Sequence, residues 1–223
     1  MSIPAVAALL LAALATPASE GTAPRGAAPA AAPATSAASA AELTRKVQAF
    51  YEKTRDLEAA FTQTYVYAGV GRKLTSTGTL KVKKPGLMRW DYQSPSPKVV
   101  AVTGRRLVQY EPEEGQAYVD EQFDATAMTA AVGFLLGTGN LARDFESTLG
   151  EGGTLVLHPR AADPRVARIV FTVGADGEVL ATSVFDGAGN ENRLAFTAIR
   201  RNTGLADAAF EVKLPAGTRR VGK

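Results

Sequence analysis

Short strand patterns separated by Gly or Pro breaks fill most of the chain after Phe61. The breaks are too short to hold a parallel crossover, which needs about a dozen residues or more. Successive strands of this kind therefore pair as antiparallel hairpins. The pattern predicts about ten or eleven strands. They fall within residues 60–69, 74–84, 86–93, 98–104, 106–113, 116–122, 153–159, 166–174, 178–186, 192–202 and 208–215.

Two stretches have helical spacing instead. Residues 39–42 have the form of a capping box, and the helix expected behind them carries an apolar stripe of Leu43, Val47 and Phe50. A second helix is expected after Asp124, and its apolar residues are Met128, Val132, Leu135 and Leu136. Residues 141–149 are expected to add a further helical turn or two. The predicted fold class is therefore mainly β, of the α+β kind.

The first residues are not part of this fold. Residues 1–18 are apolar and end in small side chains, which is typical of a secretory signal peptide, although no Lys or Arg precedes the apolar run. Residues 19–38 are rich in Ala, Pro, Ser and Thr and have no large apolar side chain, so they are predicted to be a disordered linker. We expect an exported protein whose folded domain spans residues 39–223.

Composition excludes several classes of function. The chain has no Cys and one His, His158, so thiolate chemistry and a histidine-rich metal site are both unexpected. Its net charge is only +3, with both signs mixed along the chain, which argues against a nucleic-acid partner. The common nucleophile, phosphate-binding and metal motifs are missing as well. We therefore expect no enzyme activity, no catalytic residue, no metal and no cofactor.

One stretch, "KKPGLMRWDYQSP" at residues 83–95, holds the only Trp of the chain. Side chains alternate across a sheet, so even and odd positions face opposite ways. The odd positions here are mostly charged or polar. The even positions form an apolar face if register is kept across Pro85-Gly86, where we expect the sheet to bend. Its members are Leu80, Val82, Met88, Trp90 and Tyr92.

Lys84 interrupts this apolar face and needs an acceptor for its charge. In one interpretation its ammonium group reaches the rim of the face and stays in water. In the other it donates hydrogen bonds to backbone carbonyls of a helix lying over the face, and so latches a lid.

The order of these elements resembles the LolA family of periplasmic outer-membrane lipoprotein carriers. The resemblance covers about residues 43–119 with good specificity, and the later half is similar in layout. The matching positions are Phe61-x-Gln63, Gly78-x-Leu80, Lys84-Pro85, Arg89-Trp90, Pro95, Gly104 and Tyr110-x-Pro112.

The resemblance implies a strongly curved, unclosed antiparallel β-barrel with a helical lid over an apolar concavity. It implies that acylated lipoproteins bind the apolar face, arrive from an inner-membrane ABC transporter and leave to an outer-membrane receptor. Lys84 stands where the family has a lid-latching Arg, and Met88 stands where the family often has an aromatic residue. We expect a monomer in the periplasm.

Two other classes of function stay open on the residues alone. The same half-barrel could bind free lipid or glycolipid instead of lipoprotein. It could also be an interaction module whose apolar face is ordinary core and binds no ligand.

Overall fold

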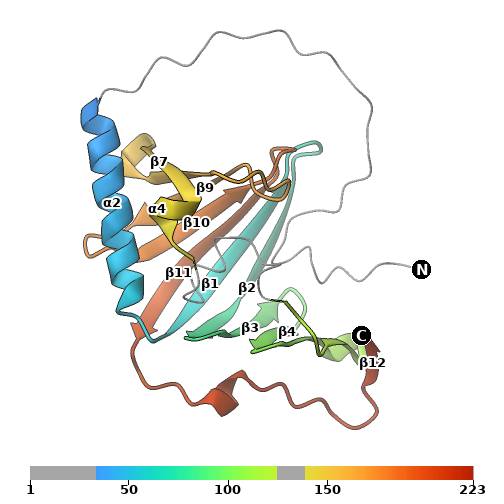
Figure 1. Ribbon diagram of the computed structural model, residues 1–223. Coiled ribbons are helices and arrows are strands. Elements are labelled where there is room, and N and C mark those ends of the chain that lie inside the picture. The colour runs from blue at the N-terminus through green and yellow to red at the C-terminus, as the bar shows by residue number, and fades with distance from the viewer. Residues whose placement is uncertain (1–33, 125–138, 223) are drawn as a thin grey trace.

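The computed structural model describes residues 34–124 and 139–222, and their strands form one twelve-stranded sheet. Its strand order is β12-β6-β5-β4-β3-β2-β1-β11-β10-β9-β8-β7. The β12–β6 pair is parallel and the other pairs are antiparallel. The outermost strands β12 and β7 are not paired with each other, so the curled sheet stays open (Figure 1). The prediction of an unclosed, curved and mainly antiparallel sheet is confirmed.

The strands are β1 (Asp56–Tyr67), β2 (Arg72–Lys83), β3 (Leu87–Ser94), β4 (Lys98–Thr103), β5 (Arg106–Glu111), β6 (Gln116–Asp120), β7 (Phe145–Leu149), β8 (Leu155–Pro159), β9 (Arg168–Val173), β10 (Val179–Phe185), β11 (Glu191–Arg201) and β12 (Arg219–Gly222). The α-helices among the described residues are α2 (Ala34–Glu52) and α4 (Leu141–Asp144). Short 3-10 turns are η1 (Pro112–Glu114), η3 (Glu151–Gly153) and η4 (Asp207–Phe210).

Most expected strands are present, but two local predictions are wrong. Residues 141–149 form one helical turn and then strand β7, because the turn of α4 ends at Phe145 in extended backbone. Residues 208–215 form η4 and irregular backbone in place of a strand, and the last strand is β12 instead. The second predicted helix, with Met128, Val132, Leu135 and Leu136, lies outside the described residues.

Helix α2 begins at Ala34, five residues before the predicted capping box, so Ser39 lies inside the helix. The extra turn is Ala-rich, and Ala has the strongest helix propensity. The helix is amphipathic: Val47, Phe50 and Tyr51 are buried, while its charged residues lie on the outer side. No helix among the described residues is both long and apolar enough to cross a bilayer.

Two apolar clusters divide the concave side of the sheet. The core cluster joins α2 and α4 to β1 and β7–β10, and its buried members are Val47, Phe50, Tyr51, Leu57, Ala59, Leu141, Phe145, Leu155, Leu157, Val166, Ile169, Phe171 and Val179. The wall cluster lies on β1–β5, and its buried members are Phe61, Leu80, Val82, Met88, Trp90, Tyr92, Val100, Val102 and Leu107. Phe196 on β11 packs against both clusters.

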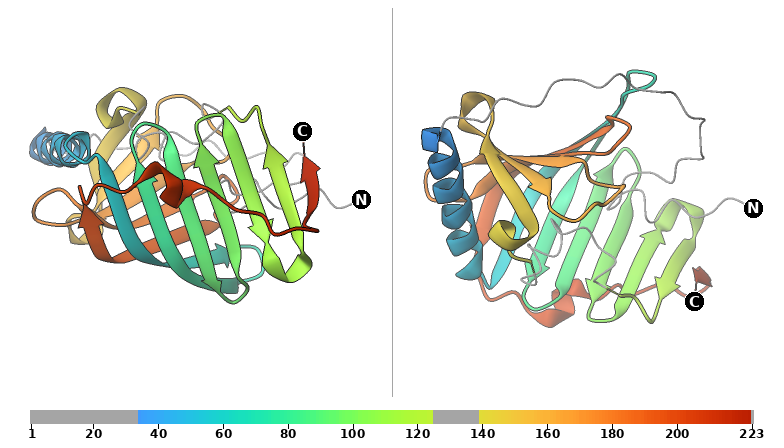
Figure 2. Two further views of the ribbon diagram at one scale, coloured as in Figure 1. Left: turned by 90° about the horizontal axis from the view of Figure 1, so that it is seen from below. Right: turned by 45° about the horizontal axis from the view of Figure 1, so that its top comes forward.

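The chain after β11 runs as a strap, residues 202–218, across the convex side of the sheet (Figure 2, left). Lys83 Nζ donates to the Leu205 carbonyl and to the Asp207 carboxylate, each at 2.6 Å. Arg89 Nη1 donates to the Glu211 carbonyl at 2.6 Å. Phe210 is fully buried, so the strap is packed against the sheet as well as hydrogen-bonded to it.

Candidate functional site

The apolar face predicted from residue parity forms one side of the sheet. Leu80 pairs with Trp90, and Val82 pairs with Met88, so the register continues across the β2–β3 turn. Leu80, Val82, Met88, Trp90 and Tyr92 are each at most 6% exposed. The odd positions, which include Arg89 and Lys83, face the strap on the convex side. The role of the even positions in binding lipid stays a prediction.

The break predicted at Pro85-Gly86 is confirmed, but it is a chain reversal and not the bend in the sheet that we expected at this place. Pro85 and Gly86 lie in the tight turn between β2 and β3, where the chain reverses. Gly86 has a φ of +72°, a left-handed conformation that favours glycine in such turns. The reversal explains why the residues on both sides of the turn pair with each other.

Phe61 is a member of the wall cluster that parity on a single hairpin could not identify. Its ring meets Trp90 edge-on at 4.9 Å between centroids and meets Tyr92 at 5.1 Å. The space for Phe61 comes from Gly78, because a Cβ there would lie 2.9 Å from the Phe61 ring and 2.1 Å from the Asp91 carbonyl oxygen. The motif Gly78-x-Leu80 thus places a gap and a wall residue side by side.

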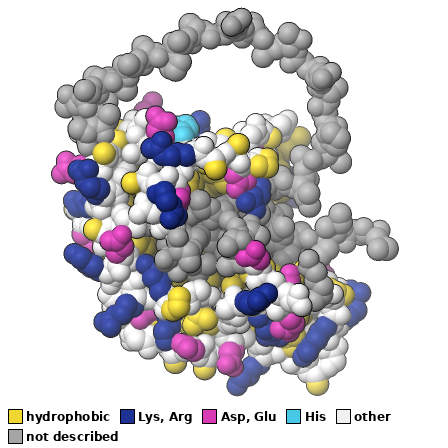
Figure 3. Space-filling view, viewed as in Figure 1, with side chains coloured by type: hydrophobic (Ala, Val, Ile, Leu, Met, Phe, Trp, Pro, Cys, Tyr) yellow, Lys and Arg dark blue, Asp and Glu magenta, His cyan; other side chains and the backbone are white. Residues whose placement is uncertain are grey.

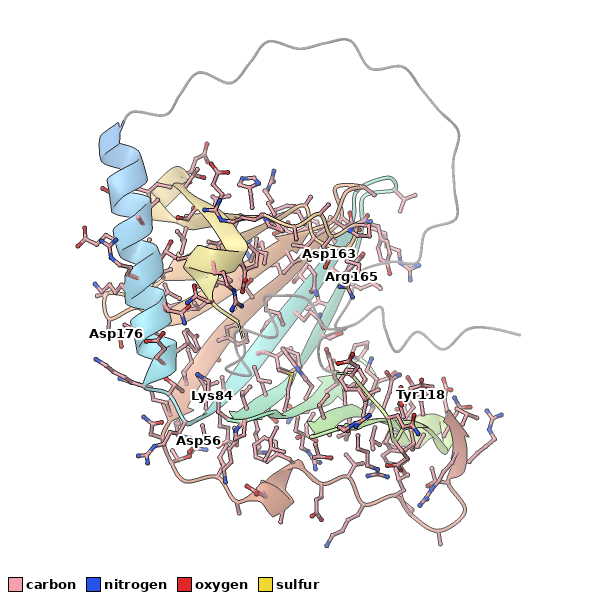
Figure 4. The ribbon with its side chains drawn as sticks, viewed as in Figure 1. Asp56, Lys84, Tyr118, Asp163, Arg165 and Asp176 are labelled. Atoms are coloured by element: carbon pink, nitrogen blue, oxygen red, sulfur yellow. The ribbon has the colours of Figure 1, made fainter. Side chains whose placement is uncertain are left out.

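Lys84 lies at the end of the wall cluster, below the last turn of α2 (Figure 4). Its Nζ donates to the Tyr51 carbonyl oxygen at 2.6 Å, and its backbone N–H donates to the Arg55 carbonyl at 2.8 Å. The last carbonyls of a helix have no intrahelical partner and carry partial negative charge. The Tyr51 carbonyl also accepts from the Thr54 N–H at 3.0 Å, so the ammonium group is its second donor, which is the kind of contact expected for a latch.

The ionisation of Lys84 reflects this half-buried position. Burial lowers the pKa of its ammonium group, and the negative charge of Glu52 raises it again in part. The contact with Tyr51 is thus a charge-assisted hydrogen bond made in a partly dry environment, where such bonds are stronger than in water.

A cleft opens between the end of α2 and the sheet at this point. It encloses about 460 Å³, including the part open to solvent. Both concave clusters contribute to its lining, because Leu80 and Val82 lie on one side and Val179 and Ile199 on the other. Lys84 and Tyr51 also line the cleft. The cleft therefore runs from the wall cluster to the core cluster, which α2 covers.

Asp56, where α2 passes into β1, is a site residue that the sequence reading missed. It is 5% exposed, and its carboxylate accepts hydrogen bonds from Thr203 N, Thr203 Oγ1 and Gly204 N. Burial raises the pKa of this carboxyl, but these hydrogen bonds outweigh burial and hold the pKa below its ordinary value. Asn202 Oδ1 also accepts from Arg55 N at 2.7 Å. The start of the strap is thus fastened beside Lys84.

The first predicted lid helix is present as α2, but it does not cover the wall cluster. Val47 and Phe50 are buried in the core cluster, and Leu43 packs against that cluster. Arg201 of β11 stacks on the Phe50 ring at 4.4 Å. These side chains cover the other half of the concave side, because α2 packs against β7, β8 and α4. The end of α2 reaches the β2–β3 turn through Lys84.

The surface around the site combines apolar and charged side chains. Hydrophobic side chains are visible on this face of the molecule, while Lys, Arg, Asp and Glu side chains lie along the side that α2 forms (Figure 3). Within residues 34–124 and 139–222 there is no group of three or more His, Cys, Asp or Glu side chains that could hold a metal ion. The geometry offers an apolar surface with a charged rim.

Comparison with known proteins agrees with this geometry. The family model described as "Outer membrane lipoprotein carrier protein LolA" matches residues 52–213. A relative named outer-membrane lipoprotein carrier protein from Dechloromonas aromatica is 29% identical over 178 residues, covering 78% of this chain and 85% of the relative. A relative of the same name from Alkalilimnicola ehrlichii is 30% identical over 183 residues, covering 81% of this chain and 82% of the relative.

Among solved structures, an uncharacterized conserved protein from Thermus thermophilus is similar with a TM-score of 0.50 and 15% identity. The similarity covers 83% of this chain and 99% of that one, and it concerns the fold alone. The family match spans well over half of the 223 residues, and the open sheet with its apolar concave side agrees with it. The chain belongs to the LolA family of outer membrane lipoprotein carrier proteins.

Proposed function

We propose that this protein is a periplasmic carrier that binds the acyl chains of lipoproteins released from the inner membrane and delivers them to the outer membrane. The observation that carries the proposal is the wall cluster, nine buried apolar side chains that all come from strands on one concave face. The relatives in the carrier family support the same function.

The size of the hydrophobic effect explains why such a surface is needed. Each buried CH₂ group is worth about 0.8 kcal/mol, so a lipoprotein with several acyl chains does not leave a membrane unaided. A carrier must offer a comparable apolar area and still release the chains. An apolar surface covered by the carrier's own structure when empty lowers the net affinity, because binding must first displace that cover.

The latch is part of this proposal. Lys84 holds the end of α2 through the Tyr51 carbonyl, and both residues line the cleft where acyl chains would enter. Breaking this contact would widen the cleft between α2 and β2. Cargo would come from an inner-membrane ABC transporter and leave to an outer-membrane receptor, and no covalent chemistry would occur. Export would require a signal peptide in residues 1–18, which N-terminal sequencing of the mature protein can check.

The experiment is a two-step transfer assay with the purified protein. Loading is measured as lipoprotein released from spheroplasts in complex with the protein, and delivery as lipoprotein moved from that complex to outer membranes. A native mass spectrum of the protein from the periplasm identifies what it carries. Bound acylated polypeptide with both transfer steps supports the proposal. Bound lipid without polypeptide, or nothing bound and no transfer, refutes it in favour of a lipid binder or an interaction module.

A further inference from the structure

Polarity changes along the wall strands in a regular way. Cross-strand partners form three rows on the concave face, and the first two run across β2 to β6. The row nearest the β2–β3 turn is Val82, Met88, Val102, Leu107 and Asp120; the middle row is Leu80, Trp90, Val100, Gln109 and Tyr118; the third holds Gly78, Tyr92 and Lys98. The first row is apolar over four strands, whereas the third contains a lysine whose Nζ lies 4.7 Å from the Tyr92 ring centroid.

The middle row holds two buried polar atoms that have no hydrogen-bond partner among the described residues. They are Trp90 Nε1 and Gln109 Oε1, on residues 5% and 4% exposed. Gln63 Oε1 on neighbouring β1 is also unpartnered. All three residues face the concave side, because Gln63 pairs with Leu194, which packs against the wall cluster.

The polarity of the two middle-row atoms is fixed. An indole N–H can only donate. Gln109 Nε2 donates to Glu111 Oε1 at 2.7 Å, and a carboxylate only accepts, so the unpartnered atom of Gln109 must be its carbonyl oxygen. Gln63 differs, because its partner Asn192 is also an amide and both groups can rotate together. The middle row therefore presents one fixed donor and one fixed acceptor.

Buried polar groups without partners are costly, because they lose their hydrogen bonds to water without replacement, and are therefore rare. Here an unpartnered donor and an unpartnered acceptor lie in one row of an otherwise apolar surface. This arrangement indicates that a ligand makes the missing hydrogen bonds. Val100 stands between Trp90 and Gln109, so their backbones are about 10 Å apart across two strand spacings. An amide hydrogen-bonded at both ends spans roughly 8 Å between the outer donor and acceptor atoms.

We propose that Trp90 and Gln109 bind the amide group through which an acyl chain is attached to its cargo. Trp90 Nε1–H donates to the amide carbonyl, and Gln109 Oε1 accepts from the amide N–H. The hydrocarbon tail then lies over the apolar first row toward the cleft, and the polar part of the cargo leaves past Lys98. An ester offers a carbonyl but no N–H, so it satisfies Trp90 alone. This inference rests on the proposed carrier function and specifies which linkage the carrier recognises.

The first test observes the indole directly. Because Trp90 is the only Trp, the uniformly ¹⁵N-labelled full chain gives one indole N–H resonance. The probe is palmitoyl-Gly-Ser-Lys, in which the acyl chain is held by an amide. On binding, the indole proton is expected to move downfield and exchange more slowly with solvent. Binding that leaves the indole proton unshifted and its exchange unchanged overturns the proposal.

The second test separates donor from acceptor. A palmitoyl-sarcosine version of the probe keeps the carbonyl but replaces the amide N–H by N–CH₃. The protein is expected to bind the glycine probe about three- to tenfold more tightly, as one lost hydrogen bond predicts. Gln109→Leu is expected to reduce this ratio to about one. Gln122→Leu makes the same substitution at an exposed position and should keep the ratio.

These outcomes distinguish the inference from the function it rests on. If neither probe binds the protein, the carrier proposal fails and the amide site fails with it. If both probes bind equally well to the unmodified protein, or if Gln109→Leu keeps the preference, the carrier proposal stands and the amide site is refuted. The indole measurement needs no variant, so it remains decisive even if Gln109→Leu does not fold.

Discussion

The two apolar clusters on the concave side of the sheet are built differently. The core cluster mixes helix and strand: α2 contributes Val47, Phe50 and Tyr51, and α4 contributes Leu141. The buried members of the wall cluster, within the part of the chain that the structure describes, all come from strands. Three buried polar side chains also lack one partner each among the described residues, and all lie on the wall half or beside it.

This difference indicates that the core cluster serves stability and the wall cluster serves binding. A cluster with its helix and strands fully interlocked resembles an ordinary domain core, whose burial serves stability. A cluster made only of strand side chains, with an unpartnered donor in it and unpartnered acceptors beside it, resembles a surface whose covering can be exchanged for a ligand. Equal substitutions in the two clusters are therefore expected to have unequal effects on folding and on binding.

The largest effect is expected from Met88→Glu. The variant places a carboxylate among the wall side chains, where an unpaired charge costs several kcal/mol once acyl chains cover it. Because tenfold in affinity is about 1.4 kcal/mol, loading should weaken at least about a hundredfold. The fold should survive, since a covering that can be exchanged for a ligand can also open and let the carboxylate reach water. The amount of lipoprotein released from spheroplasts measures this, with circular dichroism as the test of folding.

Leu180→Glu is the matched control, because Leu180 is 40% exposed on β10, away from the wall cluster. It makes a similar change from an apolar side chain to a carboxylate and should load normally. If Met88→Glu unfolds the protein while Leu180→Glu does not, the wall cluster is ordinary core and the contrast between the clusters disappears.

The next effect compares two leucine truncations. Leu157, fully buried in the core cluster, and Leu80, 2% exposed in the wall cluster, are both on strands. Leu157→Ala should lower the free energy of unfolding by about 3–5 kcal/mol, and Leu80→Ala by about 2 kcal/mol, because a site that relaxes or admits water loses less. Urea denaturation measures both. Equal losses would mean that the two clusters are packed alike.

A smaller effect concerns the junction of the two halves at Asp56. Its folded-state pKa lies below the ordinary value, so its stabilisation is complete above the unfolded pKa of about 3.9 and is lost as pH falls through the folded pKa. Asp56→Asn should lower the free energy of unfolding at neutral pH by about 1–3 kcal/mol. The variant should also lose less further stability than the unmodified protein below about pH 4. Urea denaturation curves from about pH 7 to about pH 3 test this, and parallel curves for both proteins would contradict it.

The smallest change in stability is expected for Lys84→Leu. It removes the hydrogen bond to the Tyr51 carbonyl and adds apolar surface at the cleft, so opening becomes easier and acyl chains are held more tightly. Loading should persist while delivery to outer membranes slows, and loaded protein should accumulate. Stability should change by about 1 kcal/mol or less, as for one half-exposed hydrogen bond.

Lys84→Arg is the control, because a guanidinium group can make the same contact with the helix end. It should deliver lipoprotein like the unmodified protein. Normal delivery by Lys84→Leu would refute the latch and leave the wall cluster unaffected.

The sequence predicts the sheet and one face of it well, because those depend on local alternation. Leu80 to Tyr92 could be assigned to one face from parity alone, and the assignment needed only that register continue across the turn at Pro85. The residues that other strands add to that face are harder to predict. Phe61 enters it through the pairing of β1 with β2, and Gln109 through two further strands.

The strap shows where alternation misleads. Val212 and Leu214 pack against the cluster that contains Val108 and Ala117 on the convex side. Residues two apart in the strap therefore do share one face, as they would in a strand. Yet this segment has no ladder partner among the described strands, and the sequence pattern cannot distinguish a strap that lies on a sheet from a strand within one. The Asp56 contact was missed for a related reason, because its partners Thr203 and Gly204 are distant in the chain.

The position of β1 has a consequence for the time course of folding. This strand lies at the centre of the sheet between β2 and β11. Just before it, Arg55 N donates to Asn202 Oδ1, which is 147 residues further along the chain. Such distant pairings raise contact order and slow folding. A nascent chain can form the hairpins β2 to β6 long before β11 exists. During that interval the wall cluster is uncovered beside the unpaired edge of β1, so we expect this protein to depend on chaperones more during folding than afterwards.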